Sequence, residues 1–224
     1  MDNTPNNVIE KIIERFPSFR EAFDHCEKNS TEIVLFGSYA YGCEHVESDI
    51  DILFVGNRKR KASRYFDFIW VKPERINSKT WLCSELAIHI ANYGIWLKGD
   101  GAWRNQVFFS QAASTRKKQR IFERLTHIYL QREKLSLAKK KLFIQKIILN
   151  TLRLKNLNNK IPNPPICVTI NDLQDPYRFF HEIFKPHLLG PVGKVFFEEI
   201  FPKYEIENVL YSTLNDLKQI YKAI

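Results

Sequence analysis

Two aspartates one residue apart are the residues whose type and spacing are best suited to chemistry. Asp49 and Asp51 open a predicted strand, where side chains at i and i+2 share a face, so both carboxylates project to the same side. Carboxylates this close repel each other unless a cation lies between them. Mg²⁺ prefers one or two carboxylates together with substrate phosphates. The pair therefore predicts a magnesium site that acts on a phosphorylated substrate.

A glycine and a serine precede this pair by a fixed spacing. Gly37 and Ser38 end the apolar run EIVLF, and ten residues separate Ser38 from Asp49. Glycine lets the backbone approach a ligand closely, and Ser38 offers a hydroxyl at the start of a predicted helix, which suits a phosphate group. A cation and a phosphate cradle together indicate a metal-bound triphosphate.

Asp67 is the candidate for a third carboxylate. It is the one acidic residue in the predicted strand 65–71, whose other residues are apolar or aromatic. An unpaired buried charge costs several kcal/mol. Asp67 is therefore expected either to join the metal site or to face water on an edge strand.

With G-S-x10-D-x-D between two strands and a later strand that carries an aspartate, residues 30–99 resemble the polymerase β-like nucleotidyltransferase superfamily. The ten-residue spacing is most similar to the minimal nucleotidyltransferase group. The resemblance implies transfer of an NMP, with AMP as the expected group, from an NTP to an acceptor hydroxyl with release of pyrophosphate. Only 15 residues separate Asp51 from Asp67, where many members insert a longer excursion.

The resemblance also implies roles for these residues. Asp49 and Asp51 would ligate two Mg²⁺ ions, with Mn²⁺ as a possible substitute, and Asp67 would ligate the ion that holds the acceptor and could take its proton. Gly37 and Ser38 would hold the β- and γ-phosphates of the NTP.

The elements that position these residues follow from periodicity. Val8 to Phe23 has helical spacing interrupted at Pro17, which predicts one kinked helix or two short ones. Strands are expected at 32–36, 49–55 and 65–71, with a basic hairpin or short excursion over 56–63, then a helix over 84–93 ending at Gly94 as a C′ glycine and a short strand from Ile95.

The remainder of the chain has only helical patterns. Basic helices are predicted over 115–158 with a break near 133–136, then a proline-rich connector at 161–165, and C-terminal helices over 175–224 that start at Asp175 and Pro176. The fold class is therefore α+β: a small mixed-sheet nucleotidyltransferase core at 1–99 followed by an all-helical domain at 100–224.

The positive charge is concentrated in one segment. The chain has a net charge of +9, and residues 101–161 hold 15 basic and 2 acidic side chains. The densest runs predict a surface for a polyanion, and they are Arg116, Lys117, Lys118 and Arg120, followed by Lys139, Lys140 and Lys141. A solvated helix face is the alternative.

This charge, together with the resemblance to the minimal nucleotidyltransferase group, ranks the acceptors. An RNA end, such as that of a tRNA, comes first, then a hydroxyl of a partner protein that would be adenylylated, then a small molecule or nucleotide signal. A non-catalytic module that binds RNA or a partner is the alternative outside enzymology. Composition adds that the chain is a globular protein, because 44% of its residues are hydrophobic. No stretch resembles a signal sequence or reaches the 18 apolar residues of a membrane span, so we expect a cytoplasmic protein without a membrane partner.

Overall fold

The computed structural model describes residues 5–45, 48–57, 61–62, 65–131 and 134–171, together with Asn215. These residues belong to two compact units, Met1–Phe109 and Ser110–Ala223. The helices predicted over 175–224 lie outside the described ranges, apart from Asn215.

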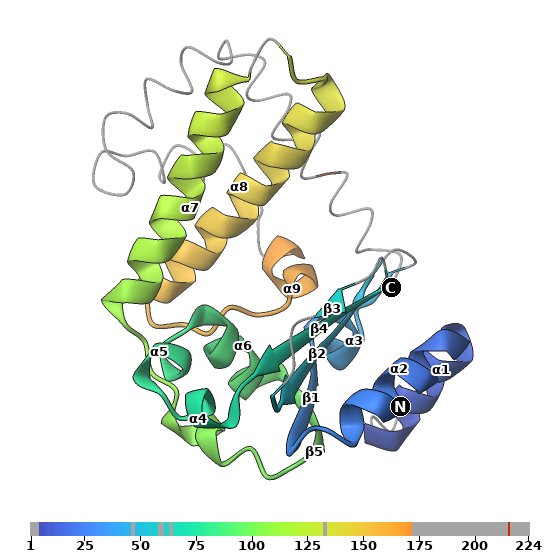
Figure 1. Ribbon diagram of the computed structural model, residues 1–224. Helices are drawn as coiled ribbons and strands as arrows, with labels where there is room; N and C mark the ends of the chain where they lie inside the picture. The colour runs from blue at the N-terminus through green and yellow to red at the C-terminus, as the bar shows by residue number, and fades with distance from the viewer. Residues whose placement is uncertain are drawn as a thin grey trace. The chain divides into compact units, whose positions relative to one another are not determined.

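A five-stranded mixed sheet forms the centre of the first unit (Figure 1). Its strands are β1 (Glu32–Phe36), β2 (Ile50–Val55), β3 (Lys61–Ala62), β4 (Phe66–Val71) and β5 (Ile95–Lys98), arranged in the order β3-β4-β2-β1-β5. The three main predicted strands and the short one from Ile95 are confirmed. The predicted fold class, a small mixed sheet followed by helices, is confirmed as well.

The pairing of β2 with β4 decides how the two aspartate strands meet. They pair in parallel, while β1 is antiparallel to both β2 and β5. A tight hairpin joins only antiparallel strands, so the hairpin alternative for 56–63 is wrong and the excursion alternative is right. The excursion includes the short β3, which pairs antiparallel with β4 at the edge of the sheet.

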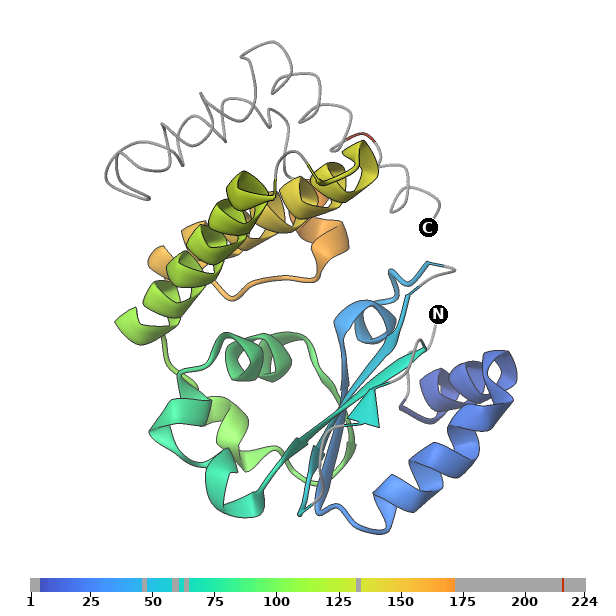
Figure 2. The same ribbon diagram turned by 45° about the horizontal axis from the view of Figure 1, so that its top comes forward.

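Both faces of the sheet are buried, which explains why β1 is a continuous apolar run rather than an alternating one. On one face Ile33, Ile52 and Phe54 pack with helices α1 (Pro5–Arg15) and α2 (Pro17–Glu27). On the other face Val34 and Leu53 pack with residues of the helices that follow β4. Figure 2 shows the strands between these two sets of helices.

The helices of the first unit begin and end where their residue types require. Helix α1 stops before Pro17, which becomes the first residue of α2, so the two-helix alternative is confirmed. Helices α4 (Pro73–Ile76), α5 (Lys79–Leu82) and α6 (Glu85–Tyr93) follow β4, and a 3₁₀ turn, η1, spans Ala102–Gln106. Ser84 caps α6 because its Oγ accepts a hydrogen bond from the Ala87 N–H.

Gly94 ends α6 for a different reason from the one predicted. Helix α6 ends at Gly94 as predicted, but Gly94 has an extended conformation with φ −80° instead of the left-handed conformation that is typical of a C′ glycine. A Cβ at this position would lie 2.7 Å from the Ile90 carbonyl oxygen and 2.7 Å from Val34 Cγ1. Glycine is therefore needed here for space between α6 and β1.

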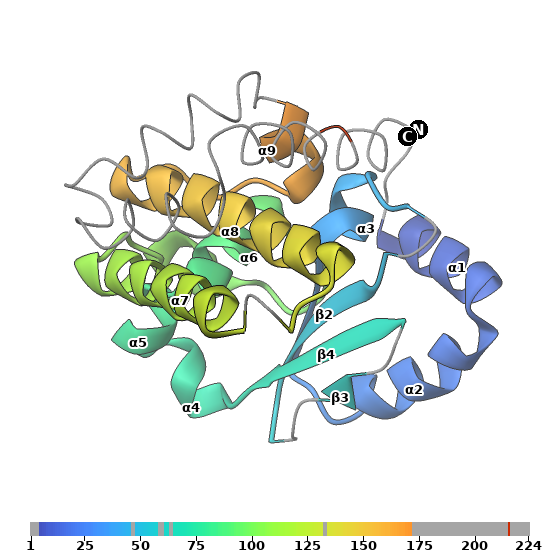
Figure 3. The ribbon, with the colours of Figure 1, turned by 90° about the horizontal axis from the view of Figure 1, so that it is seen from above.

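Two long helices dominate the described part of the second unit. Helix α7 (Gln111–Leu130) and helix α8 (Leu137–Asn158) lie side by side, as Figures 1 and 3 both show. Their bounds confirm the two predicted basic helices, and the break lies at 131–136. Ser136 caps α8 by accepting a hydrogen bond from the Lys139 N–H. Residues 161–165 have no regular structure, and helix α9 (Ile166–Asn171), which the sequence did not predict, follows them. Among the helices that the structure describes, none is long and apolar enough to cross a membrane.

Candidate active site

Gly37 lies at the junction between β1 and helix α3 (Gly37–Tyr41). Its φ is +74°, in the left-handed region that residues with a Cβ rarely adopt. A Cβ added to Gly37 would also clash with Asp51 Oδ2 and lie 3.2 Å from Asp51 Cγ. Gly37 is therefore required both by its backbone conformation and by the close approach of a carboxylate, and Ser38 follows it immediately.

Strand register brings the two strand aspartates together. Phe36, the last residue of β1, is paired with Asp51 across the antiparallel pair, and Asp51 is paired with Asp67 across the parallel pair. Directly opposed residues of an antiparallel pair have their Cβ atoms about 4.5–5.5 Å apart, and neighbouring strands of any sheet lie about 4.7–4.9 Å apart. Three strands thus deliver the glycine junction, Asp51 and Asp67 to one place on the sheet, where both carboxylates are half-buried.

Asp49 stands just before this ladder. It precedes Ile50, the first residue of β2, and its side chain is exposed, whereas Asp51 is half-buried. The chain is fixed at this point because the Ile50 N–H donates to the Tyr65 carbonyl oxygen at 2.8 Å. Strand β2 therefore starts one residue later than predicted, and the exposed Asp49 lies just outside the strand, two residues before Asp51.

The donor set suits a hard divalent cation. The groups beside Gly37 are carboxylate oxygens, which Mg²⁺ and Mn²⁺ prefer to nitrogen or sulfur ligands. Within the ranges that the structure describes, no group of three acidic, histidine or cysteine side chains is placed so that it could hold a metal ion, so Asp49, Asp51 and Asp67 do not converge as one three-carboxylate group. The paired Asp51 and Asp67 are the carboxylates that could hold Mg²⁺, which needs one or two carboxylates together with substrate phosphates and water.

A polar cluster beside Asp49 was not predicted from the sequence. The phenol of Tyr39 is 7% exposed, and its charge environment includes Arg15, Glu44 and Asp49. The Arg15 guanidinium lies 6.0 Å from the centre of the Tyr39 ring and donates to the His45 carbonyl oxygen at 3.5 Å. The residue types between Ser38 and Asp49 do not indicate this cluster, because its members come from α1, α3 and the loop before Asp49.

Replacing Tyr39 with Phe should leave the unfolding free energy at neutral pH unchanged or raise it by about 1 kcal/mol. The Tyr39 hydroxyl is buried without a hydrogen-bond partner among the described residues, and leaving such a group unsatisfied is costly. Burial raises the pKa of Tyr39 above its ordinary 10.0. The neutral phenol therefore contributes fully to the stability of the folded state below pH 10.0, and this contribution is lost as the pH rises through the folded-state pKa. Urea unfolding at neutral and alkaline pH tests this. Wild type should lose more stability in alkali than Tyr39→Phe, and equal losses would contradict the assignment.

Lys117 corrects the predicted polyanion surface. Its side chain is 4% exposed, and its Nζ donates to Asn150 Oδ1 of α8 at 3.1 Å. It lies four residues before Ile121 and eight before Leu125, so it falls on the buried face of α7. The same spacing could have placed it there from the sequence, and Lys117 is not part of an exposed charged surface.

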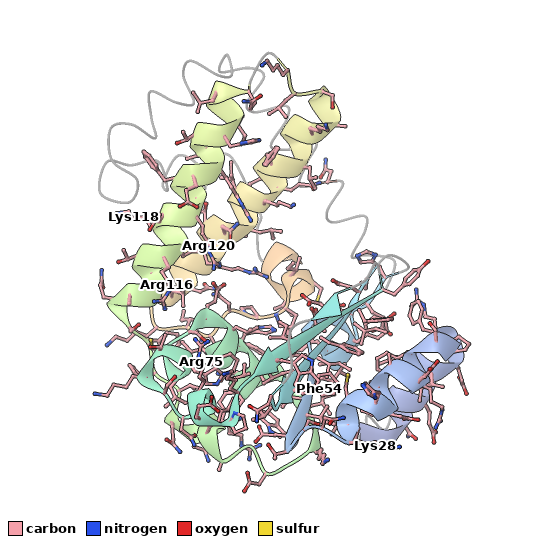
Figure 4. The ribbon with its side chains drawn as sticks, viewed as in Figure 1. Lys28, Phe54, Arg75, Arg116, Lys118 and Arg120 are labelled. Carbon is pink, nitrogen blue, oxygen red and sulfur yellow. The ribbon has the colours of Figure 1, made fainter. Side chains whose placement is uncertain are left out.

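Each of the other predicted cations is either exposed or has a side chain outside the described residues. Arg116, Lys118 and Arg120 are exposed along α7, where Figure 4 labels them, and Lys139 is exposed on α8. The side chains of Lys140 and Lys141 lie outside the described residues, although their backbone belongs to α8.

Arg124 is a further cation of α7, and it was not among the residues predicted for the polyanion surface. Burial, and after it the nearby guanidinium groups of Arg120 and Arg153, hold the pKa of Arg124 below its ordinary value. Arg124 Nη1 also donates to the Lys146 carbonyl oxygen at 3.4 Å. The guanidinium groups of Arg120 on α7 and Arg153 on α8 each lie close enough to Arg124 to repel it, and we call Arg120, Arg124 and Arg153 the arginine cluster.

The comparison with protein-family models agrees with the location of the site. Residues 17–97 match the family model described as nucleotidyltransferase domain. No curated protein sequence matches the chain. Among solved structures, the chain is similar to a nucleotidyltransferase-like protein from Exiguobacterium sibiricum 255-15 at 10% identity and a TM-score of 0.36, with 96% of this chain and 75% of that chain covered. The matched segment contains Gly37, Ser38 and the three aspartates.

Proposed function

We propose that this chain moves AMP from ATP to the 3′ hydroxyl of an RNA, and the match of residues 17–97 to the family model described as nucleotidyltransferase domain supports this proposal. The observation that carries the transfer is the pairing of Asp51 with Asp67 beside the Gly37 junction. Carboxylates are concentrated there and the backbone approaches closely, as a metal-bound triphosphate requires.

Each residue has a proposed role in this reaction. Gly37 and Ser38 hold the β- and γ-phosphates through the backbone and the serine hydroxyl. Asp49, Asp51 and Asp67 would hold two divalent cations, which supply the positive charge that stabilises the attacking and leaving oxygens when they are bound. Asp67, on the neighbouring strand, orients the acceptor hydroxyl and receives its proton.

The bonds in this step balance without a further reactant. The acceptor oxygen forms a bond to the α-phosphorus of ATP, and the bond from that phosphorus to the bridging oxygen breaks. The leaving group is pyrophosphate, and the hydroxyl proton passes to the Asp67 carboxylate. Catalysis then consists of positioning and of charge stabilisation rather than of a covalent intermediate on the protein.

The charge of the helical unit supports RNA as the acceptor. Residues 116–160 hold 14 basic and 2 acidic side chains, and a bound triphosphate needs only a few of them. The phosphates of an RNA backbone provide anions at the spacing of a chain, which such a row of exposed cations can bind.

Replacing both Arg116 and Arg120 with Gln should weaken RNA binding and reduce its salt dependence. Each lost contact to a single-stranded backbone lowers the slope of log K against log salt by about 0.7. Fluorescence anisotropy of a labelled single-stranded oligoribonucleotide at several salt concentrations measures this slope.

The matched control removes two positive charges from exposed positions of the first unit. Lys28 and Arg75 are both exposed residues of the first unit, and Figure 4 labels both of them. The double variant Lys28→Gln, Arg75→Gln should keep the wild-type slope. Equal slopes for the two double variants would show that only net charge matters and would contradict the proposed RNA surface. In that case a hydroxyl of a partner protein becomes the better acceptor.

A further inference from the structure

A row of aromatic rings begins at the candidate active site and was not predicted from the sequence. The Tyr41 ring of α3 packs edge-to-face on the Tyr93 ring of α6, with 6.2 Å between the centres. The Tyr93 ring lies 5.4 Å from the His89 ring, and the His89 ring lies 6.3 Å from the Phe36 ring. We call Tyr41, Tyr93 and His89 the aromatic shelf.

The inner end of the shelf is attached to the site. Phe36 touches His89 and is the strand partner of Asp51, and it immediately precedes Gly37. Tyr41 follows Ser38 by three residues on α3, a spacing that places two side chains on the same side of a helix. The shelf therefore starts at the paired carboxylates and continues on the side of α3 that carries the phosphate-binding serine.

The outer end of the shelf is open to ligands. The Tyr41 side chain is 48% exposed, whereas Tyr93 and His89 are half-buried. Burial, and after it the neighbouring Tyr41, raise the pKa of Tyr93, so this phenol stays neutral across the physiological pH range. The exposed Tyr41 ring, which packs against the Tyr93 ring, therefore offers a flat, uncharged surface.

We propose that Tyr41, supported by Tyr93, is the surface on which the base of the nucleoside triphosphate stacks. This inference rests on the proposed function, because it assigns the base of the same NTP whose phosphates lie at Gly37 and Ser38. The chemistry of the shelf selects this part of the ligand. Phosphates require cations or several hydrogen-bond donors, which aromatic faces do not provide, whereas every nucleobase has a π-face.

Stacking without hydrogen bonds to the base edge gives a particular specificity. Purines present a larger face than pyrimidines, so ATP and GTP should bind more tightly than CTP and UTP. The rings provide no contact that separates adenine from guanine, and selection between those two requires other groups.

Isothermal titration of the full chain with Mg²⁺-ATP and with Mg²⁺-tripolyphosphate tests the shelf. Tyr41→Leu should raise the Kd for ATP roughly 5- to 150-fold, the range found when a stacking aromatic is removed, and leave the Kd for tripolyphosphate unchanged. Tyr41→Phe keeps the ring and should retain wild-type affinity for both ligands. Phe122→Leu is the matched control, because Phe122 is an aromatic residue of α7 that is 41% exposed.

Each alternative result overturns a different statement. If Tyr41→Leu binds ATP like wild type, or loses affinity for ATP and tripolyphosphate equally, Tyr41 does not hold the base. If Tyr41→Phe loses as much affinity as Tyr41→Leu, the phenol hydroxyl acts and stacking is wrong. If wild type binds neither ligand, the proposed function fails together with the shelf, whereas normal binding that is insensitive to Tyr41 removes the shelf alone.

Discussion

Replacing Asp51 with Asn should lower nucleotidyl transfer about 10³-fold or more while the protein remains folded. The substitution removes a charge that would hold a divalent cation, and stabilisation by such a cation is worth several kcal/mol in the transition state. Asn has nearly the same shape as Asp and removes one of two directly opposed negative charges, so the thermal midpoint should stay the same or rise. Steady-state release of pyrophosphate and a thermal melt measure the two effects.

Asp24→Asn provides the control for this variant. Asp24 is an exposed acid of α2, which packs on the sheet from the side of Ile52 and Phe54. Its loss changes the net charge by the same amount and should leave transfer unchanged. Activity that persists in Asp51→Asn would place the metal elsewhere in the chain.

Replacing Gly37 with Ala should cost both stability and activity. A residue with a Cβ in the left-handed region costs about 1–2 kcal/mol, and the new methyl group would push against the Asp51 carboxylate. A displacement of about 1 Å at a reacting centre can reduce the rate about 10²-fold. Denaturant unfolding and the same pyrophosphate assay give the two numbers.

Gly42→Ala separates the two causes of that loss. Gly42 has nearly the same φ, +71°, but a Cβ there meets nothing within 4 Å. It should lose similar stability and keep its activity. If both variants lose activity equally, the backbone conformation rather than the carboxylate explains the loss, and the close approach of Gly37 to Asp51 has no catalytic meaning.

The parts of the site that could be predicted are local in sequence. The glycine–serine pair and Asp49 with Asp51 stand out by type and spacing, and the apolar runs on either side predict the strands that carry them. The strand of Asp67 was also predicted, but its alignment with Asp51 depends on a parallel pairing, which no local pattern specifies. Register is set by packing on both faces of the sheet and is therefore a property of the whole fold.

The parts that could not be predicted depend on contacts between distant segments. The cluster of Arg15, Tyr39 and Glu44 and the aromatic shelf each join residues from two or three elements. Glycine is a residue type that commonly ends helices, yet the role of Gly94 is to leave room for Val34. Lys117 is the exception, because its spacing from Ile121 and Leu125 already indicated burial and only its charge suggested otherwise.

The most direct measurement is intact mass spectrometry of RNA and protein after incubation of the chain with each NTP and Mg²⁺. The proposed function predicts that RNA gains the mass of one or more AMP units from ATP, that pyrophosphate is released in equal amount, and that Asp51→Asn gives neither product. A mass gain on protein would change the acceptor and keep the transfer. No gain of NMP mass on any acceptor, with wild type and Asp51→Asn indistinguishable, would contradict the account.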